Sequence, residues 1–180
     1  MTEVEIFFDQ FENWALLDIE LLLRLKDDSG KKLKPDRRIQ AYHRPFVASV
    51  ILMCCAIDCL SAFRYGRRDG DGVGQQYKKF IREYFPNKYD NVLVYKGLRN
   101  ALIHGYSMDG VGLSHTNKRR HLAMENERVV FDVFTLFDDL CIAYGKYKTE
   151  LGTGKYLSEF RRRSKKHPIA RWVGKSRAKI

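Results

Sequence analysis

A short segment in the middle of the chain carries the side chains best suited to chemistry. The segment 95–106 contains Arg99, Asn100 and His104, and its apolar residues recur at the three- and four-residue steps of one helix face. Gly105 follows as a typical helix terminator, which places His104 in the last turn. Histidine changes charge near neutral pH and can act as a base or an acid, while guanidinium and carboxamide groups bind phosphate. The segment therefore predicts a phosphate site.

The position of Arg99 on this helix requires a second contact. On a straight helix Asn100 and His104 lie roughly 40° apart, whereas Arg99 and His104 lie roughly 140° apart. Arg99 must reach around the helix to meet His104, or it must contact another surface. Asp58 is a candidate partner, because it interrupts an otherwise apolar run and a buried, unpaired carboxylate is costly. Asp58 is predicted either to pair with Arg99 or to reach solvent or cap the backbone.

The spacing of these residues resembles the signature of the HEPN superfamily. The similarity consists of an arginine, four residues and a histidine, with a polar residue after the arginine and Gly-Tyr after the histidine, here Arg99 to Tyr106. An apolar helix expected over Phe46–Phe63 precedes the motif, and the segment 77–86 is similar to the one that stands before the motif in one prokaryotic branch. The resemblance covers about Phe46 to Tyr106.

The resemblance implies a fold, an activity and a mechanism. Members are small helical proteins, many of them metal-independent endoribonucleases of toxin or defence type and some without catalysis. By this resemblance His104 is the base or acid, Arg99 the phosphate clamp and Asn100 a donor, with Asp58 and Tyr106 in supporting positions. The products would carry a 2′,3′-cyclic phosphate and a 5′-hydroxyl, without cofactor or metal. Many members form antiparallel dimers around a shared cleft, so the resemblance implies a homodimer, and it also implies a cognate antitoxin or an assembly partner.

Two other interpretations stay open at this point. In the first, the same cleft binds RNA, a nucleotide or a protein partner without cleaving anything. In the second, Arg99 pairs with Asp58, Asn100 and His104 satisfy the helix end, and the basic C-terminal segment anchors the protein to nucleic acid. A buried Arg99–Asp58 pair favours the structural interpretation, whereas an exposed Arg99 that meets His104 favours chemistry.

The charge of the chain favours a polyanionic partner. There are 33 Lys and Arg residues against 22 Asp and Glu, a net charge of +11, which suits RNA, DNA or an anionic membrane surface. Acidic residues crowd the first 28 positions and basic residues crowd the positions after 155, so opposite ends could attract each other within one chain or between two. The basic residues predicted to contact RNA, besides the motif, are Arg64, Arg67, Arg68, Lys118, Arg119 and Arg120.

The length of 180 residues suits one domain with a core. We predict a mainly α fold, an up-and-down bundle of four to five helices over residues 1–152, followed by a basic tail over 153–180 that is partly helical or disordered. A small β-hairpin is expected after the motif helix, from the runs 110–113 and 127–131 with a basic turn at 117–120. His115 and His121 flank that turn and are predicted to lie at the surface.

Cysteine usage and the N-terminus indicate the compartment. Three of the four cysteines, at positions 54, 55 and 59, fall in one apolar run, and no Cys/His pairs have zinc spacing. This pattern predicts a reducing compartment and no structural metal. The first residues are acidic where a signal peptide would be basic, and no apolar run of membrane-spanning length lacks a charge. A cytoplasmic protein without a membrane segment is therefore expected.

Overall fold

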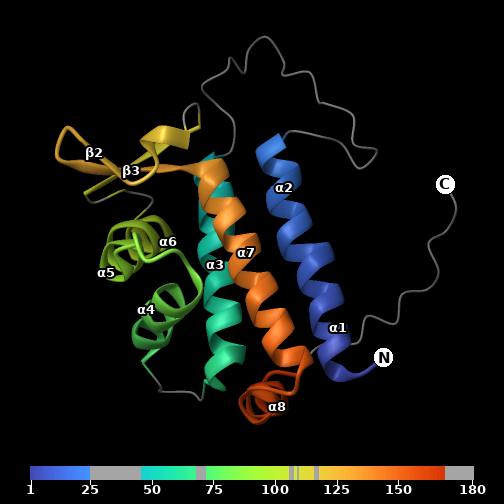
Figure 1. The fold of residues 1–180 in the computed structure, drawn as a ribbon. Coiled ribbons are helices and arrows are strands. Elements are labelled where there is room, and N and C mark those ends of the chain that lie inside the picture. The colour runs from blue at the N-terminus through green and yellow to red at the C-terminus, as the bar shows by residue number, and fades with distance from the viewer. Residues whose placement is uncertain (25–45, 68–71, 106–107, 109, 116–117, 169–180) are drawn as a thin grey trace, which may run out of the picture.

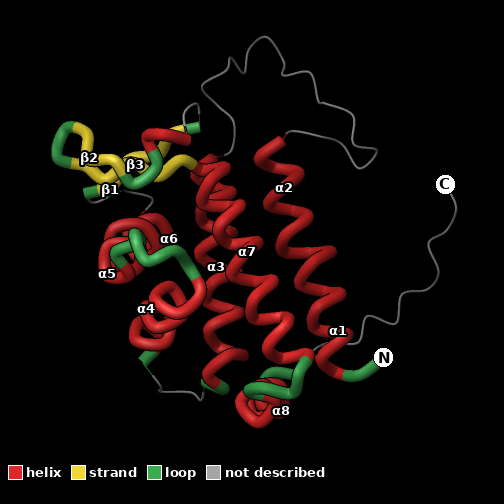
Figure 2. Tube along the Cα trace, in the orientation of Figure 1, coloured by secondary structure: helices red, strands yellow, loops and turns green. Residues whose placement is uncertain are grey.

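A computed structural model of the chain describes residues 1–24, 46–67, 72–105, 108, 110–115 and 118–168 (Figure 1). Figure 2 shows that helices make up most of this structure and that a small sheet lies at one end of the helical bundle. The prediction of a mainly α fold is thereby confirmed.

The N-terminal region forms one long helical segment. It consists of α1 (Glu3–Gln10), the π-helical turn η1 (Phe11–Leu16) and α2 (Leu17–Arg24). The segment begins with a capping box, in which the side chains of Thr2 and Glu5 each accept a hydrogen bond from the other residue's backbone N–H. The apolar side chains that face the bundle are buried, namely Phe7, Phe8, Phe11, Ile19 and Leu23, whereas Trp14 and Leu17 are exposed.

Two helices of twenty residues each, α3 (Phe46–Tyr65) and α7 (Val133–Gly152), pack against each other at the centre of the bundle. Asp132 caps α7, accepting a hydrogen bond from the backbone N–H of Thr135. By length and composition α3 could cross a membrane, yet 61% of its apolar window is buried among the other helices, as in the core helix of a soluble protein. Its buried apolar residues include Val50, Met53, Ile57 and Leu60.

The motif segment lies on a second layer beside α3. Helix α4 (Val73–Tyr84) packs on α3, and a further helical segment follows, made of α5 (Asn91–Leu93), η2 (Val94–Asn100) and α6 (Ala101–Gly105). In Figure 1 these green helices lie on the opposite side of α3 and α7 from α1 and α2. The residues of α4 that face the bundle are buried: Tyr77, Phe80, Ile81 and Tyr84.

The sheet has three strands, β1 (Val111–Ser114), β2 (Ala123–Glu125) and β3 (Arg128–Asp132), in the order β1-β3-β2. β1 pairs with β3 in parallel, with Val111 opposite Val129, and β2 pairs with β3 in antiparallel orientation. Because β3 runs directly into α7, the sheet is fixed to one end of the bundle.

The predicted hairpin between the runs 110–113 and 127–131 is wrong in its pairing. These runs are neighbours, but they are parallel, and the hairpin joins β2 and β3 through a turn at Asn126 and Glu127, both with positive φ. Of the predicted turn at 117–120, the part that the structure describes is the 3-10 helix η3 (Lys118–Arg120), which comes before β2, and residue 117 lies outside the described residues. Strand β2 runs antiparallel to β3 and carries the chain back, so β3 starts at the same end of the sheet as β1, as parallel pairing requires.

The position of His121 is the second prediction that the structure corrects. Its side chain is only 1% exposed, with Nδ1 accepting a hydrogen bond from the Asp132 N–H at 3.1 Å and Nε2 2.8 Å from the Tyr89 hydroxyl. The prediction of a surface position is wrong because both ring nitrogens find partners inside the fold. Burial, with the charge of Lys88 acting in the same direction, lowers the pKa of His121. His115 is exposed, as expected.

Helix α8 (Leu157–Lys166) covers the end of the bundle opposite the sheet (Figure 1). It packs against α3, its Phe160 is completely buried, and its Ser164 hydroxyl bonds the carboxylate of Glu3. The described part of the predicted tail 153–180 is thus partly helical and shares the core of the bundle. The contact with Glu3 also brings the acidic start of the chain beside its basic end.

Candidate functional site

The Arg99 guanidinium is the centre of the candidate site. Its Nε and Nη2 donate to the same oxygen of Asp58, Oδ2, at 3.0 and 2.6 Å. The two side chains are 15% and 16% exposed, so the ion pair is largely removed from water. The predicted pairing of Asp58 with Arg99 is therefore confirmed, and it holds the planar arginine fork in one orientation.

The third nitrogen of Arg99, Nη1, faces the other two motif side chains. It donates to Oδ1 of Asn100 at 3.0 Å and lies 3.4 Å from Nε2 of His104, which is exposed. Arginine can only donate, so in this contact Nε2 of His104 takes the place of the acceptor. The sequence left open whether Arg99 meets Asp58 or His104, and the structure shows that one guanidinium does both.

A π-helical turn carries Arg99 and Asn100. In η2 the backbone N–H of Ala101 reaches the carbonyl of Lys96, five residues earlier, as well as that of Leu98. A π turn holds an extra residue, so side chains after it are rotated around the helix axis relative to those before it. Leu98, within the π turn, and Leu102, after it, are both buried and hold the helix against the core on either side of Arg99 and Asn100. A straight helix was assumed from the sequence, and nothing in the sequence pattern signals the π turn.

Tyr95 supports the guanidinium from one side, a role that no pattern in the sequence indicates. Its ring centroid lies 5.7 Å from Cζ of Arg99 and 5.5 Å from the ring of the buried Tyr77. Gly74 makes room for this ring, because a Cβ at that position would lie 2.6 Å from the Tyr95 ring carbons. Any larger residue at 74 would have to displace the support of the arginine.

The electrostatics of the cluster leave positive charge in excess. Burial lowers the pKa of Arg99, but the hydrogen bonds and charge of Asp58 outweigh this and raise the pKa overall. Arg67 also faces the carboxylate, with Nη1 3.8 Å from Asp58 Oδ1, a distance that makes an ion pair without a hydrogen bond. Asp58 thus faces two guanidinium groups, an arrangement that attracts an anion such as a phosphate.

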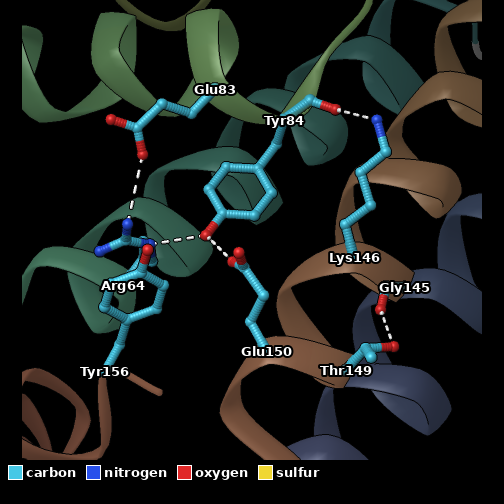
Figure 3. A pocket seen from close by; sticks show the side chains of 8 residues that line it. All are labelled: Arg64, Glu83, Tyr84, Gly145, Lys146, Thr149, Glu150 and Tyr156. Carbon is cyan, nitrogen blue, oxygen red and sulfur yellow. Dashed lines mark hydrogen bonds and ion pairs between the residues drawn. The ribbon is translucent and has the colours of Figure 1, made fainter. Parts of the chain in front are cut away.

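Arg64 does not occupy the position predicted for an RNA contact. Its side chain is 9% exposed, Nε donates to the Tyr84 hydroxyl at 2.6 Å, and Nη2 is paired with Glu83 at 3.3 Å. The Tyr156 ring stacks on the guanidinium (Figure 3). These contacts give Arg64 a structural role that joins α3, α4 and the start of α8.

The same residues line an open pocket of about 570 Å³ between α3, α4 and α7. Figure 3 shows its polar groups bonded to each other: the Tyr84 hydroxyl donates to Glu150, and Lys146 Nζ reaches the Tyr84 carbonyl. The pocket shares no lining residue with the Arg99 cluster. Because its donors and acceptors already have partners, we assign no ligand to it.

The remaining predicted RNA contacts lie apart from the cluster or outside the described residues. In the turn η3 (Lys118–Arg120), Lys118 is paired with Asp138 at 3.1 Å and Arg120 is paired with Glu125. Arg119 lies between them in the same exposed turn. Arg68 and Tyr106, both named as candidates from the sequence, lie outside the described residues.

Neither metal geometry nor known relatives define the site further. Within the described ranges, no group of three or more His, Cys, Asp or Glu side chains is arranged to hold a metal ion. No protein-family model matches the chain, and comparisons with curated proteins and with solved structures find no match.

Proposed function

We propose that this protein is a metal-independent endoribonuclease of the HEPN type, with an up-and-down HEPN-like bundle and a cytoplasmic, toxin or defence role. The observation that carries the proposal is the convergence of Arg99, Asn100 and the exposed His104 through one guanidinium nitrogen. This convergence offers a proton acceptor and a phosphate clamp within one small surface, the groups that metal-free RNA cleavage requires.

The proposed reaction begins at the ribose 2′-hydroxyl. His104 Nε2 takes its proton, the 2′-oxygen forms a bond to phosphorus, and the bond from phosphorus to the 5′-oxygen breaks. Arg99 and Asn100 donate hydrogen bonds to the negative charge that develops on the phosphorane oxygens. An acid returns a proton to the leaving 5′-oxygen, and the products are a 2′,3′-cyclic phosphate and a 5′-hydroxyl.

The second proton transfer leads us to propose a homodimer, in which His104 of another copy acts as the acid. An exposed apolar strip supports this arrangement: Leu52 and Cys55 lie on α3 within two turns before Asp58, and both are exposed. Exposed apolar surface beside a polar site is typical of an interface between subunits.

The direct test is incubation of the purified protein with labelled tRNA and a single-stranded RNA in EDTA. The wild type should cleave, and His104→Ala and Arg99→Ala should each lose at least 100-fold in rate, in line with about 10²–10⁴-fold for a general base. His115→Ala is the matched control, because His115 is exposed but outside the cluster. Equal cleavage by all four proteins would remove the proposal.

A second candidate is a non-catalytic HEPN-like protein that binds RNA, a nucleotide or a partner such as a cognate antitoxin. The observation that favours it is the hold of Asp58 on Nε and Nη2 of Arg99, which leaves Nη1 as the nitrogen aimed at Asn100 and His104. Binding of RNA by wild type without cleavage in EDTA, weakened by Arg99→Ala, is the result this candidate predicts.

A further inference from the structure

The ring of Tyr95 connects the candidate site to helix α4. Its centre lies 5.7 Å from Cζ of Arg99 and 5.9 Å from Nζ of Lys78, which belongs to α4. Helix α4 packs against α5 and η2, and Figure 1 shows these green helices next to each other. A second cation, carried by a different helix, therefore lies beside the Arg99 guanidinium and shares one aromatic ring with it.

The position of Lys78 is set by the face of α4 on which it lies. Lys78 follows Gly74 by four positions, so the two residues share one side of the helix. That side faces Tyr95, because the ring occupies the space that a Cβ at Gly74 would need. The packing of α4 on η2 thus directs the lysine toward the motif segment.

The ammonium group of Lys78 is available to a ligand. It forms no ion pair or hydrogen bond within the part of the chain that the structure describes, and its side chain is partly exposed. A ring at 5.9 Å lies near the outer limit of a cation–π contact, about 6 Å, and leaves all three N–H donors free. The charge of Arg99, by contrast, is paired with Asp58. Lys78 therefore adds an uncompensated positive charge next to the cluster.

We infer that Lys78 binds an RNA phosphate adjacent to the scissile phosphate, so that the site takes a strand rather than a single phosphodiester. This inference rests on the proposed function. Nη1 of Arg99 is aimed at Asn100 and His104, whereas Lys78 lies with Tyr95. A phosphate held at Nη1 thus leaves Lys78 for the next phosphate of the same strand. A lysine suits this task, because its flexible stem carries a point charge, and phosphate contacts position a strand without reading its sequence.

The test is a competition experiment in the His104→Ala background, which prevents cleavage. A labelled single-stranded RNA of 12 nucleotides is displaced by UpA, which has one phosphate, or by pUpA or UpAp, which carry one more phosphate on either side. Fluorescence anisotropy gives the affinity of each. One of the two added phosphates should tighten binding about tenfold, as expected for one charge-assisted hydrogen bond.

Lys78→Gln should remove that gain and leave the affinity for UpA within twofold. It should also lower the salt slope of the 12-nucleotide RNA by about 0.7, the value for one phosphate contact. Lys79→Gln is the matched control, because it removes the same charge from the neighbouring position, where Nζ is paired with Glu83 at 3.8 Å. It should change each affinity less than twofold.

The outcomes separate this inference from the proposed function. Equal effects of the two variants, or a loss for UpA as large as for the longer ligands, would overturn the role of Lys78, while RNA cleavage by the wild type in EDTA would still support the nuclease. A specific loss of the gain from the added phosphate, in a protein that never cleaves RNA, would keep the role of Lys78 and overturn the nuclease. Absence of RNA binding by the wild type would overturn both.

Discussion

The Arg99–Asp58 pair should be strongly coupled energetically, and a double-mutant cycle can measure this coupling. The substitutions are Asp58→Asn and Arg99→Gln, which remove the charges but keep side chains of similar shape. Asp58→Asn leaves Arg99, 15% exposed, without its carboxylate, and Arg99→Gln leaves Asp58, 16% exposed, with only the more distant Arg67 as a partner. The double variant leaves neither, so its loss should be smaller than the sum of the two single losses.

The magnitude follows from burial and hydrogen bonding. Breaking a fully buried ion pair costs about 3–5 kcal/mol, whereas exposed pairs are worth about 0–1 kcal/mol. With most of the pair shielded and two hydrogen bonds to one carboxylate oxygen, we expect a loss of about 2–3 kcal/mol for each single variant. The coupling energy should be about 1.5–2 kcal/mol.

The assay is urea unfolding followed by circular dichroism, with the slope m compared among the four proteins. A loss of about 2–3 kcal/mol should lower Tm by about 5–10 °C for a chain of this size. Strictly additive losses, or single-variant losses below about 0.5 kcal/mol, would refute the reasoning, because they would mean that the pair is solvated like a surface salt bridge.

Three further predictions concern other parts of the structure. Gly74→Ala should cost about 1–3 kcal/mol in urea unfolding, because its Cβ would overlap the Tyr95 ring; an unchanged stability would contradict the close approach. The pKa of His121 is lowered from 6.5, so the unfolded state takes up the proton first as pH falls, and the unfolding free energy should drop between pH 7 and 5. His121→Asn should lack that drop; a drop of the same size would assign it to other groups. In light scattering the protein should be a dimer that Leu52→Lys dissociates and that Ile142→Lys, at another exposed apolar site on α7, does not; a monomeric wild type would refute the shared site.

The Arg99 partner could be predicted from the sequence because a single energetic argument applied to it. A carboxylate in an apolar run must pair with a cation or reach solvent, and Asp58 pairs with Arg99. The long helices could also be predicted from the sequence, because apolar residues at helical spacing over ten or more positions fit few other kinds of secondary structure. Asp132 as the cap of α7 follows from the same local logic.

The parts that could not be predicted depend on contacts between distant residues or on short segments. The three residues of β2 are too few to show the alternation of apolar and polar residues that marks a strand. The pairing of β3 with both β1 and β2 could therefore not be predicted from the sequence. Burial of His121 depends on Tyr89, far away in the chain, and that of Arg64 on Tyr84 and Tyr156. Such tertiary contacts override the rule that charged and polar residues lie at the surface.

Identification of the product ends tests the central claim most directly. A defined single-stranded RNA is incubated in EDTA with the protein at neutral pH, and the fragments are analysed by mass spectrometry. Attack by the 2′-hydroxyl, with His104 as base and Arg99 at the phosphate, predicts 2′,3′-cyclic phosphate and 5′-hydroxyl ends, and none from an RNA carrying a 2′-deoxy nucleotide at the cleaved position. Fragments with 5′-phosphate ends, or cleavage that persists at the deoxy position, would contradict the account.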